Sequence, residues 1–127
     1  MKVQSIIAAV AGLSLIAMPV AASAHGSMKP SHGGIVAISG ETMVELVRAP
    51  GGVDIYITEE DAPLAASGFT GKLTITTDGA KSDAALVGQT GNRMTAPGLV
   101  IPAGAKVVVA LTGNGSGAKT FITFMVK

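Results

Sequence analysis

His25, Met28 and His32 lie within one short run of the sequence, His-Gly-Ser-Met-Lys-Pro-Ser-His, and the chain has no other histidine. Imidazole nitrogens bind Cu(II), Zn(II) and Ni(II), whereas a thioether sulfur favours Cu(I). The chain also has no Cys, so a thiolate site is excluded. The run therefore indicates a metal site with His25, His32 and Met28 as candidate ligands, copper as the first choice of metal and zinc as the alternative.

Residues 1–24 resemble a secretory signal peptide. Lys2 precedes an apolar stretch that ends in the small residues Ala22-Ser23-Ala24, which is the charged, apolar and A-x-A pattern of a cleaved signal. The stretch is shorter than the roughly 20 apolar residues that cross a bilayer. We therefore expect a periplasmic or secreted protein with no membrane insertion after cleavage.

Cleavage after Ala24 would make His25 the first residue of the mature protein. Its α-amine and its Nδ1 atom would then chelate one ion together, and the amine titrates near pH ~7.7–8.0, so a metal displaces its proton at neutral pH. Two other interpretations stay open. The cut could fall two residues earlier, and both histidines could be solvated residues of a frayed terminus.

Charge and motifs exclude several classes of function. The chain carries nine Lys and Arg against eight Asp and Glu, without a basic run, so nucleic acid and anionic membranes are poor partners. No G-x-S-x-G or H-E-x-x-H motif occurs, and Glu45 and Asp54 show no sign of a catalytic pair. The acidic run Glu59-Glu60-Asp61 lacks the spacing of a calcium loop and is predicted to be a solvated loop. The protein is expected not to be an enzyme.

Gly and Pro divide residues 35–127 into short segments rich in β-branched residues, as strands are. Asp78-Gly79 predicts a tight type I′ hairpin turn. We expect an all-β fold, a small antiparallel Greek-key β-sandwich of immunoglobulin-like or cupredoxin-like form. Seven strands are expected at Ile35–Ile38, Thr42–Val47, Val53–Thr58, Lys72–Thr77, Ala80–Val87, Ala105–Leu111 and Thr120–Val126, with an eighth near Asn92–Thr95 or Leu99–Ile101. The chain thus divides into the signal peptide (1–24), a His/Gly-rich amino-terminal segment (25–34) and one β-sandwich domain (35–127).

The alternation of side chains along these segments predicts which residues of each strand face the core. Val53, Ile55 and Ile57 share one side of their strand and should face the core. Both faces of Thr120–Val126 are fairly apolar, which predicts a strand that is central in its sheet or covered on both sides. Met43, Met94 and Met125 are predicted to fill gaps in the core, as Met commonly does.

The run Ser31-His32-Gly33-Gly34-Ile35-Val36, together with Met43–Val47, Val53–Ile57 and a Pro63-Leu64 loop, resembles the small His-Gly-Gly β-domain of periplasmic proteins. That domain also occurs in periplasmic adaptor subunits of heavy-metal efflux pumps of the resistance-nodulation-division type. The family often carries His in the loop after the third strand, where this chain has Thr58-Glu59-Glu60-Asp61-Ala62. The resemblance implies a role in metal handling.

A mature chain that begins with His25 after cleavage and folds as a small β-sandwich is also similar to the CopC-like periplasmic copper carriers. Only His25 can be carried over from that family, because the chain has no late His. We therefore expect a non-enzymatic metal-binding carrier or homeostasis protein, for copper above all, that serves a metal efflux system or a cuproenzyme. The alternative is a structural or adaptor β-sandwich that binds a protein partner by strand addition and has no metal role.

Overall fold

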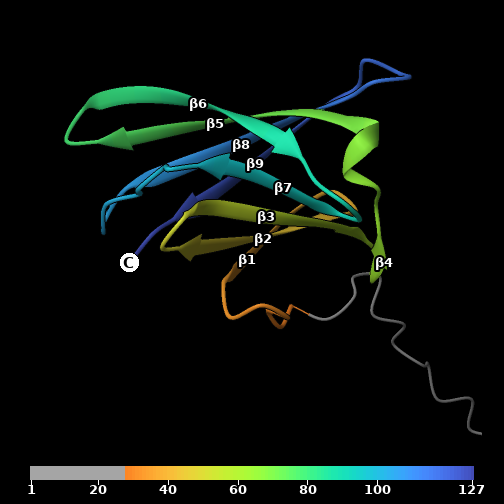
Figure 1. Cartoon of the computed structure of the whole chain (residues 1–127), viewed down its shortest axis with the longest axis horizontal. Helices are drawn as coiled ribbons and strands as arrows, with labels where there is room; N and C mark the ends of the chain where they lie inside the picture. The colour runs from red at the N-terminus through yellow and green to blue at the C-terminus, as the bar shows by residue number, and fades with distance from the viewer. Residues whose placement is uncertain (1–27) are drawn as a thin grey trace, which may run out of the picture.

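The computed structural model describes residues 28–127, and this part of the chain is all-β, as the sequence predicts (Figure 1). Each of the seven expected strands is present, and the eighth is the first of the two alternatives, near residues 92–95. The elements are β1 (Ile35–Ser39), β2 (Thr42–Ala49), β3 (Gly52–Glu59), β4 (Ala62–Pro63), the 3₁₀ turn η1 (Ala66–Gly68), β5 (Phe69–Thr77), β6 (Ala80–Gly88), β7 (Arg93–Pro97), β8 (Lys106–Gly113) and β9 (Lys119–Met125).

The strands pair in the order β1-β2-β3-β7-β6-β5-β8-β9, and every pairing is antiparallel. Three consecutive strands, β5, β6 and β7, are followed by β8, which returns to lie beside β5. This arrangement is a Greek key. Strand β6 joins the two layers of the sandwich, because residues 80–86 pair with β5 whereas Val87 and Gly88 pair with β7. Strands β1 and β9, at the two ends of the order, approach each other and nearly close the sheet.

The turns follow local backbone preferences. Asp78 and Gly79 both have positive φ, 50° and 79°, which confirms the type I′ turn. Glu60 and Asp61 also have positive φ, 49° and 66°, and they form a second tight turn between β3 and β4. A solvated loop was expected here. The prediction missed this turn because Glu seldom adopts positive φ, but both acids are exposed as expected.

The core lies between the two layers and confirms the faces predicted for Val53, Ile55 and Ile57. Met94 is also buried there. The prediction that the last strand is central or covered on both sides is wrong, and so is the core position of Met125. Strand β9 ends the pairing order, and its outward-facing Phe121 and Met125 are 57% and 64% exposed. Apolar residues are common on protein surfaces, so an apolar face alone does not show that a strand is covered.

Among residues 28–127, no helix is long and apolar enough to span a membrane.

Candidate functional site

Glu45 is a buried carboxylate on the outer face of the sandwich. Its neighbours on β2, Val44 and Leu46, point into the core, so the alternation of the strand directs Glu45 outward. The residue is nevertheless only 5% exposed. The cover comes from the segment before β1, residues 31–34, which turns back over β2 and contacts the carboxylate.

Four hydrogen bonds hold that segment to Glu45. Oε1 accepts one from the backbone N–H of Ser31 at 3.0 Å and one from Nδ1 of His32 at 2.9 Å. Oε2 accepts one from the backbone N–H of His32 at 2.8 Å and one from that of Gly34 at 2.9 Å. Both carboxylate oxygens are therefore saturated by donors from residues 31–34, and the carboxylate fixes the path of the chain into β1.

The two glycines after His32 explain why the chain can follow this path. Gly33 has a φ of +73°, in the left-handed region that other residues adopt at a cost. Gly34 packs so closely on β2 that a Cβ atom there would collide with the backbone oxygen of Leu46. The His-Gly-Gly sequence is thus a local requirement for bringing a histidine onto a buried carboxylate.

The imidazole of His32 lies flat on the ring of Tyr56. The ring centroids are 3.6 Å apart and the planes differ by 4°. Tyr56 stands directly opposite Glu45 in the β2–β3 pairing, so the stack and the hydrogen bond fix the ring together. The His32 side chain is still 43% exposed.

The protonation state of Glu45 determines which nitrogen of His32 is open. Burial by itself raises the pKa of the Glu45 carboxyl, but the hydrogen bonds from the His32 side chain and from the backbone of Gly34, His32 and Ser31 outweigh it and hold the pKa below its ordinary value. Glu45 is therefore a carboxylate at neutral pH and only accepts hydrogen bonds. Nδ1 of His32 must carry the hydrogen, which leaves the lone pair of the neutral ring on Nε2. In the described part of the chain no hydrogen bond or ion pair uses that atom.

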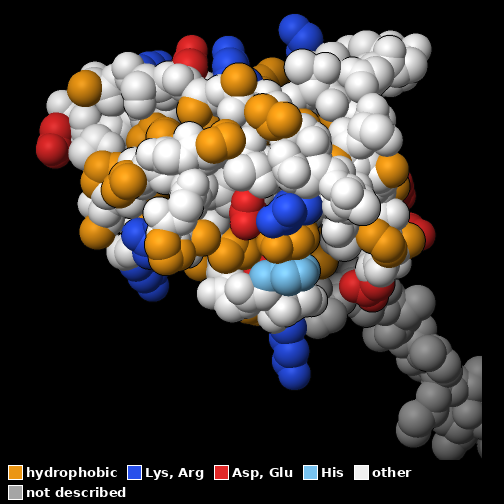
Figure 2. Space-filling view, viewed as in Figure 1, with side chains coloured by type: hydrophobic (Ala, Val, Ile, Leu, Met, Phe, Trp, Pro, Cys, Tyr) orange, Lys and Arg blue, Asp and Glu red, His pale blue; other side chains and the backbone are white. Residues whose placement is uncertain are grey.

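Charged side chains flank the stack. Arg93 stands opposite Tyr56 in the β3–β7 pairing, and its Nη1 lies 3.8 Å from Oδ2 of Asp54. Thr95 donates a hydrogen bond to Oδ1 of Asp54 at 2.7 Å. In Figure 2 the pale-blue His side chain lies at the surface next to hydrophobic, basic and acidic side chains. Glu45 and Asp54 thus have separate hydrogen-bond and ion-pair partners.

The other predicted ligands are placed only in part. Met28 is 54% exposed, and His25 lies outside the described residues, so convergence of His25, Met28 and His32 stays a prediction. Within residues 28–127 no three His, Cys, Asp or Glu side chains gather in a group that could hold a metal. Met43 lies on the same outward face of β2 as Glu45 and is partly buried, whereas Met94 lies in the core.

Sequence reasoning missed the role of Glu45, which was considered only as a partner for Asp54. The available signal was a single carboxylate between apolar residues on both sides, in Met-Val-Glu-Leu-Val. A buried carboxylate needs strong donors, and the segment that begins with Ser31 supplies them.

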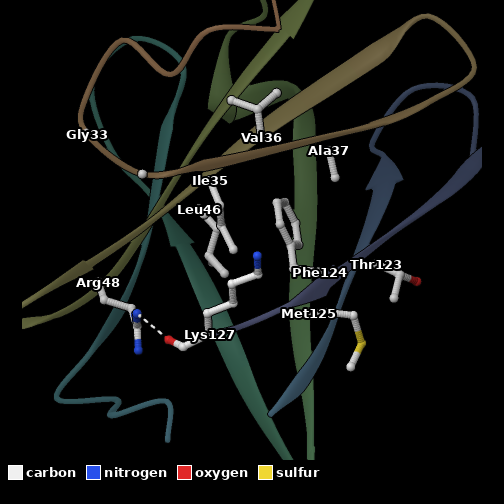
Figure 3. A pocket seen from close by; sticks show the side chains of 11 residues that line it. Gly33, Ile35, Val36, Ala37, Leu46, Arg48, Thr123, Phe124, Met125 and Lys127 are labelled. Carbon is white, nitrogen blue, oxygen red and sulfur yellow. Dashed lines mark hydrogen bonds between the residues drawn. The ribbon is translucent and has the colours of Figure 1, made fainter. Parts of the chain in front are cut away.

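A second feature is the cleft where β1 and β9 face each other (Figure 3). Its volume is about 460 Å³, and Ile35, Ala37 and Phe124 contribute apolar walls. At one end Arg48 donates a hydrogen bond to the backbone oxygen of Lys127 at 3.1 Å. No ladder of hydrogen bonds joins the two strands in the described structure. Both strand edges in the cleft are therefore unpaired.

No protein-family profile, no curated protein and no solved structure matches the chain. The function must therefore be inferred from the fold and from the geometry around Glu45 and His32.

Proposed function

We propose that the protein is a non-enzymatic metal-binding carrier or homeostasis protein of the periplasm, and that copper is its metal. The observation that supports this most is the hydrogen bond between Nδ1 of His32 and Glu45. Histidines that bind metals almost always donate their other ring N–H to a carboxylate, a backbone carbonyl or a water, which fixes the tautomer and makes the ligating nitrogen more basic. His32 has that arrangement, with a half-exposed ring and an open Nε2 atom.

The remaining ligands would come from the segment that precedes His32. A mature terminus at His25 contributes its α-amine and its imidazole, which with Nε2 of His32 form a three-nitrogen set suited to Cu(II). Met28, between the two histidines and exposed, adds a thioether for Cu(I). Zinc is the alternative metal for the same nitrogens. The cargo would then pass to an efflux system or a cuproenzyme.

Copper titration of the secreted protein tests this function, after intact-mass measurement of its amino terminus. His25→Ala and His32→Asn should each weaken copper binding. Asn is the informative replacement at position 32, because its amide N–H₂ can still donate to Glu45 from about the place of Nδ1, whereas nothing replaces Nε2. Lys72→Ala, on the outer face of the other layer, is the control. An unchanged affinity in both His variants, or a mature terminus that is not His25, would contradict the proposal.

The alternative, an adaptor that accepts a partner strand, is favoured by the unpaired edges of β1 and β9 in the cleft. An added strand gains main-chain hydrogen bonds from such edges. The same titration separates the two functions. If the protein is an adaptor with no metal role, the wild-type protein and the His32→Asn variant should have the same copper affinity.

A further inference from the structure

Most of β6 has one unpaired edge. Residues 80–86 pair with β5, but only Val87 and Gly88 reach β7. The backbone hydrogen bonds found outside the ladders do not involve residues 80–86 of the described chain. In Figure 1 the turn of the β5–β6 hairpin lies at one end of the molecule, beyond the ends of β3 and β7. The outer edge of β6 is therefore open to another strand.

Two opposite charges lie along this edge. Lys81 and Asp83 are two positions apart, so both point to the outer face of the layer, and both are exposed. Asp83 is held in place there, because Thr74 donates a hydrogen bond to its Oδ1 at 2.7 Å and Nζ of Lys72 lies 3.9 Å from its Oδ2. Lys81 stands opposite Thr76 on β5, so the ladder within the chain does not provide it with an opposite charge.

We propose that this edge pairs with the same edge of a second copy of the chain, in a two-fold antiparallel contact with Ser82 on the axis. Residues that stand directly opposite in an antiparallel pair point to the same face. With Ser82 on the axis, Lys81 faces Asp83 of the second copy, and the symmetry repeats the pair in the other direction.

The charges favour the register with Ser82 on the axis over the two registers that are shifted by one residue. An axis at Lys81 or at Asp83 sets two like charges directly opposite each other, which is destabilising. An axis at Ser82 places each Lys81 opposite an Asp83 of the other copy. It also places Ala80 opposite Ala84 of the second copy, so only small side chains meet on the other face. The two β5–β6 layers then continue as one sheet across the dimer.

The contact is small, since it rests on one short strand edge from each copy. Stable interfaces bury about 1,200–2,000 Å², and we expect this pairing to bury less. The dimer should therefore be weak and reversible, so that it appears as the concentration rises. Because two charge pairs contribute, it should also weaken as salt increases.

Charge exchange tests the contact with the secreted protein, by sedimentation equilibrium over a range of concentrations at low ionic strength. Wild type should dimerise. Lys81→Asp and Asp83→Lys should each weaken dimerisation about tenfold or more, since each replaces two attractive pairs by two repulsive ones. An equimolar mixture of the two variants should regain the dimer, because each introduced charge then faces its opposite. Lys119→Asp, a charge reversal on β9, should dimerise like wild type.

Each contrary result overturns the proposal. Wild type that stays monomeric up to its solubility limit has no such contact. Reversal variants that dimerise as wild type does would show that another surface is used. A mixture that stays monomeric, with each variant folded by circular dichroism, would exclude the Ser82 register. None of these results depends on metal binding at His32.

Discussion

Nδ1 of His32 lies 2.9 Å from Oε1 of Glu45, at the point where the segment before β1 meets the outer face of β2. The same carboxylate also holds three backbone N–H groups of residues 31–34. One buried side chain therefore does two things. It determines where the amino-terminal segment lies, and it orients the imidazole that the proposed function needs.

Replacing Glu45 by Gln should destabilise the fold by about 2–3 kcal/mol. The amide oxygen can replace one carboxylate oxygen, but the amide nitrogen would face N–H donors, and hydrogen bonds to a charged group contribute roughly 1.5–3 kcal/mol. Urea unfolding at pH 7 measures the loss. Glu41→Gln, at an exposed position in the β1–β2 turn, should change stability by less than about 0.5 kcal/mol. Equal stability of the two variants would show that the four contacts contribute little.

Acid should remove the contribution of the Glu45 carboxylate to the free energy of unfolding. Its pKa in the folded protein lies below the ordinary value of 4.5, so the unfolded chain takes up the proton first as the pH falls. The stabilisation is fully present above pH 4.5 and is lost as the pH falls through the lower, folded-state pKa. Urea unfolding from pH 7 to pH 2 should show the stability difference between wild type and Glu45→Gln narrowing below about pH 4.5. A difference that stays constant across that range would contradict this linkage.

The sequence predicted most of the fold because strands and tight turns have local signals. The alternation in β3 and the Asp78-Gly79 dipeptide each show up within a few residues. The contacts of Glu45 join positions 11 to 14 residues apart, and no local pattern reports them. His32 was identified by its residue type, whereas its stack on Tyr56 depends on how β2 pairs with β3. The prediction for β9 was wrong for two reasons. The pairing order, which composition does not report, places this strand at an edge of the sheet. An apolar outer face does not show that another layer covers it.

Gly34→Ala should be more damaging than an alanine at another glycine. Its Cβ would collide with the backbone oxygen of Leu46, and backbone atoms in a ladder cannot move aside cheaply. We expect a loss of about 2 kcal/mol or more, measured by thermal unfolding. Gly51→Ala is the matched control, because a Cβ there meets nothing within 4 Å. If both variants melt at the same temperature, the close approach of residue 34 to β2 is not a constraint.

Replacement of the two phenylalanines on β9 should change the stability by very different amounts. Phe124 is 3% exposed and packs in the core, so Phe124→Ala should cost about 3–5 kcal/mol. Phe121 is 57% exposed, and Phe121→Thr should change stability by less than about 0.5 kcal/mol. Urea unfolding of both variants measures the contrast. A large loss in Phe121→Thr would mean that something covers the outer face of β9.

The neutral imidazole of His32 should carry its hydrogen on Nδ1, because the Glu45 carboxylate only accepts hydrogen bonds, and long-range ¹H–¹⁵N NMR spectra detect this tautomer directly. Removal of a carboxylate that orients a ligating His typically weakens metal binding about 10–100-fold, so Glu45→Gln should weaken copper binding by that factor if Nε2 is a ligand. His32→Asn removes the nitrogen itself and should weaken binding at least as much. An Nδ1–H tautomer combined with unchanged copper affinity in both variants would show that the histidine only helps to hold the amino-terminal segment, and the metal site would then have to be sought elsewhere.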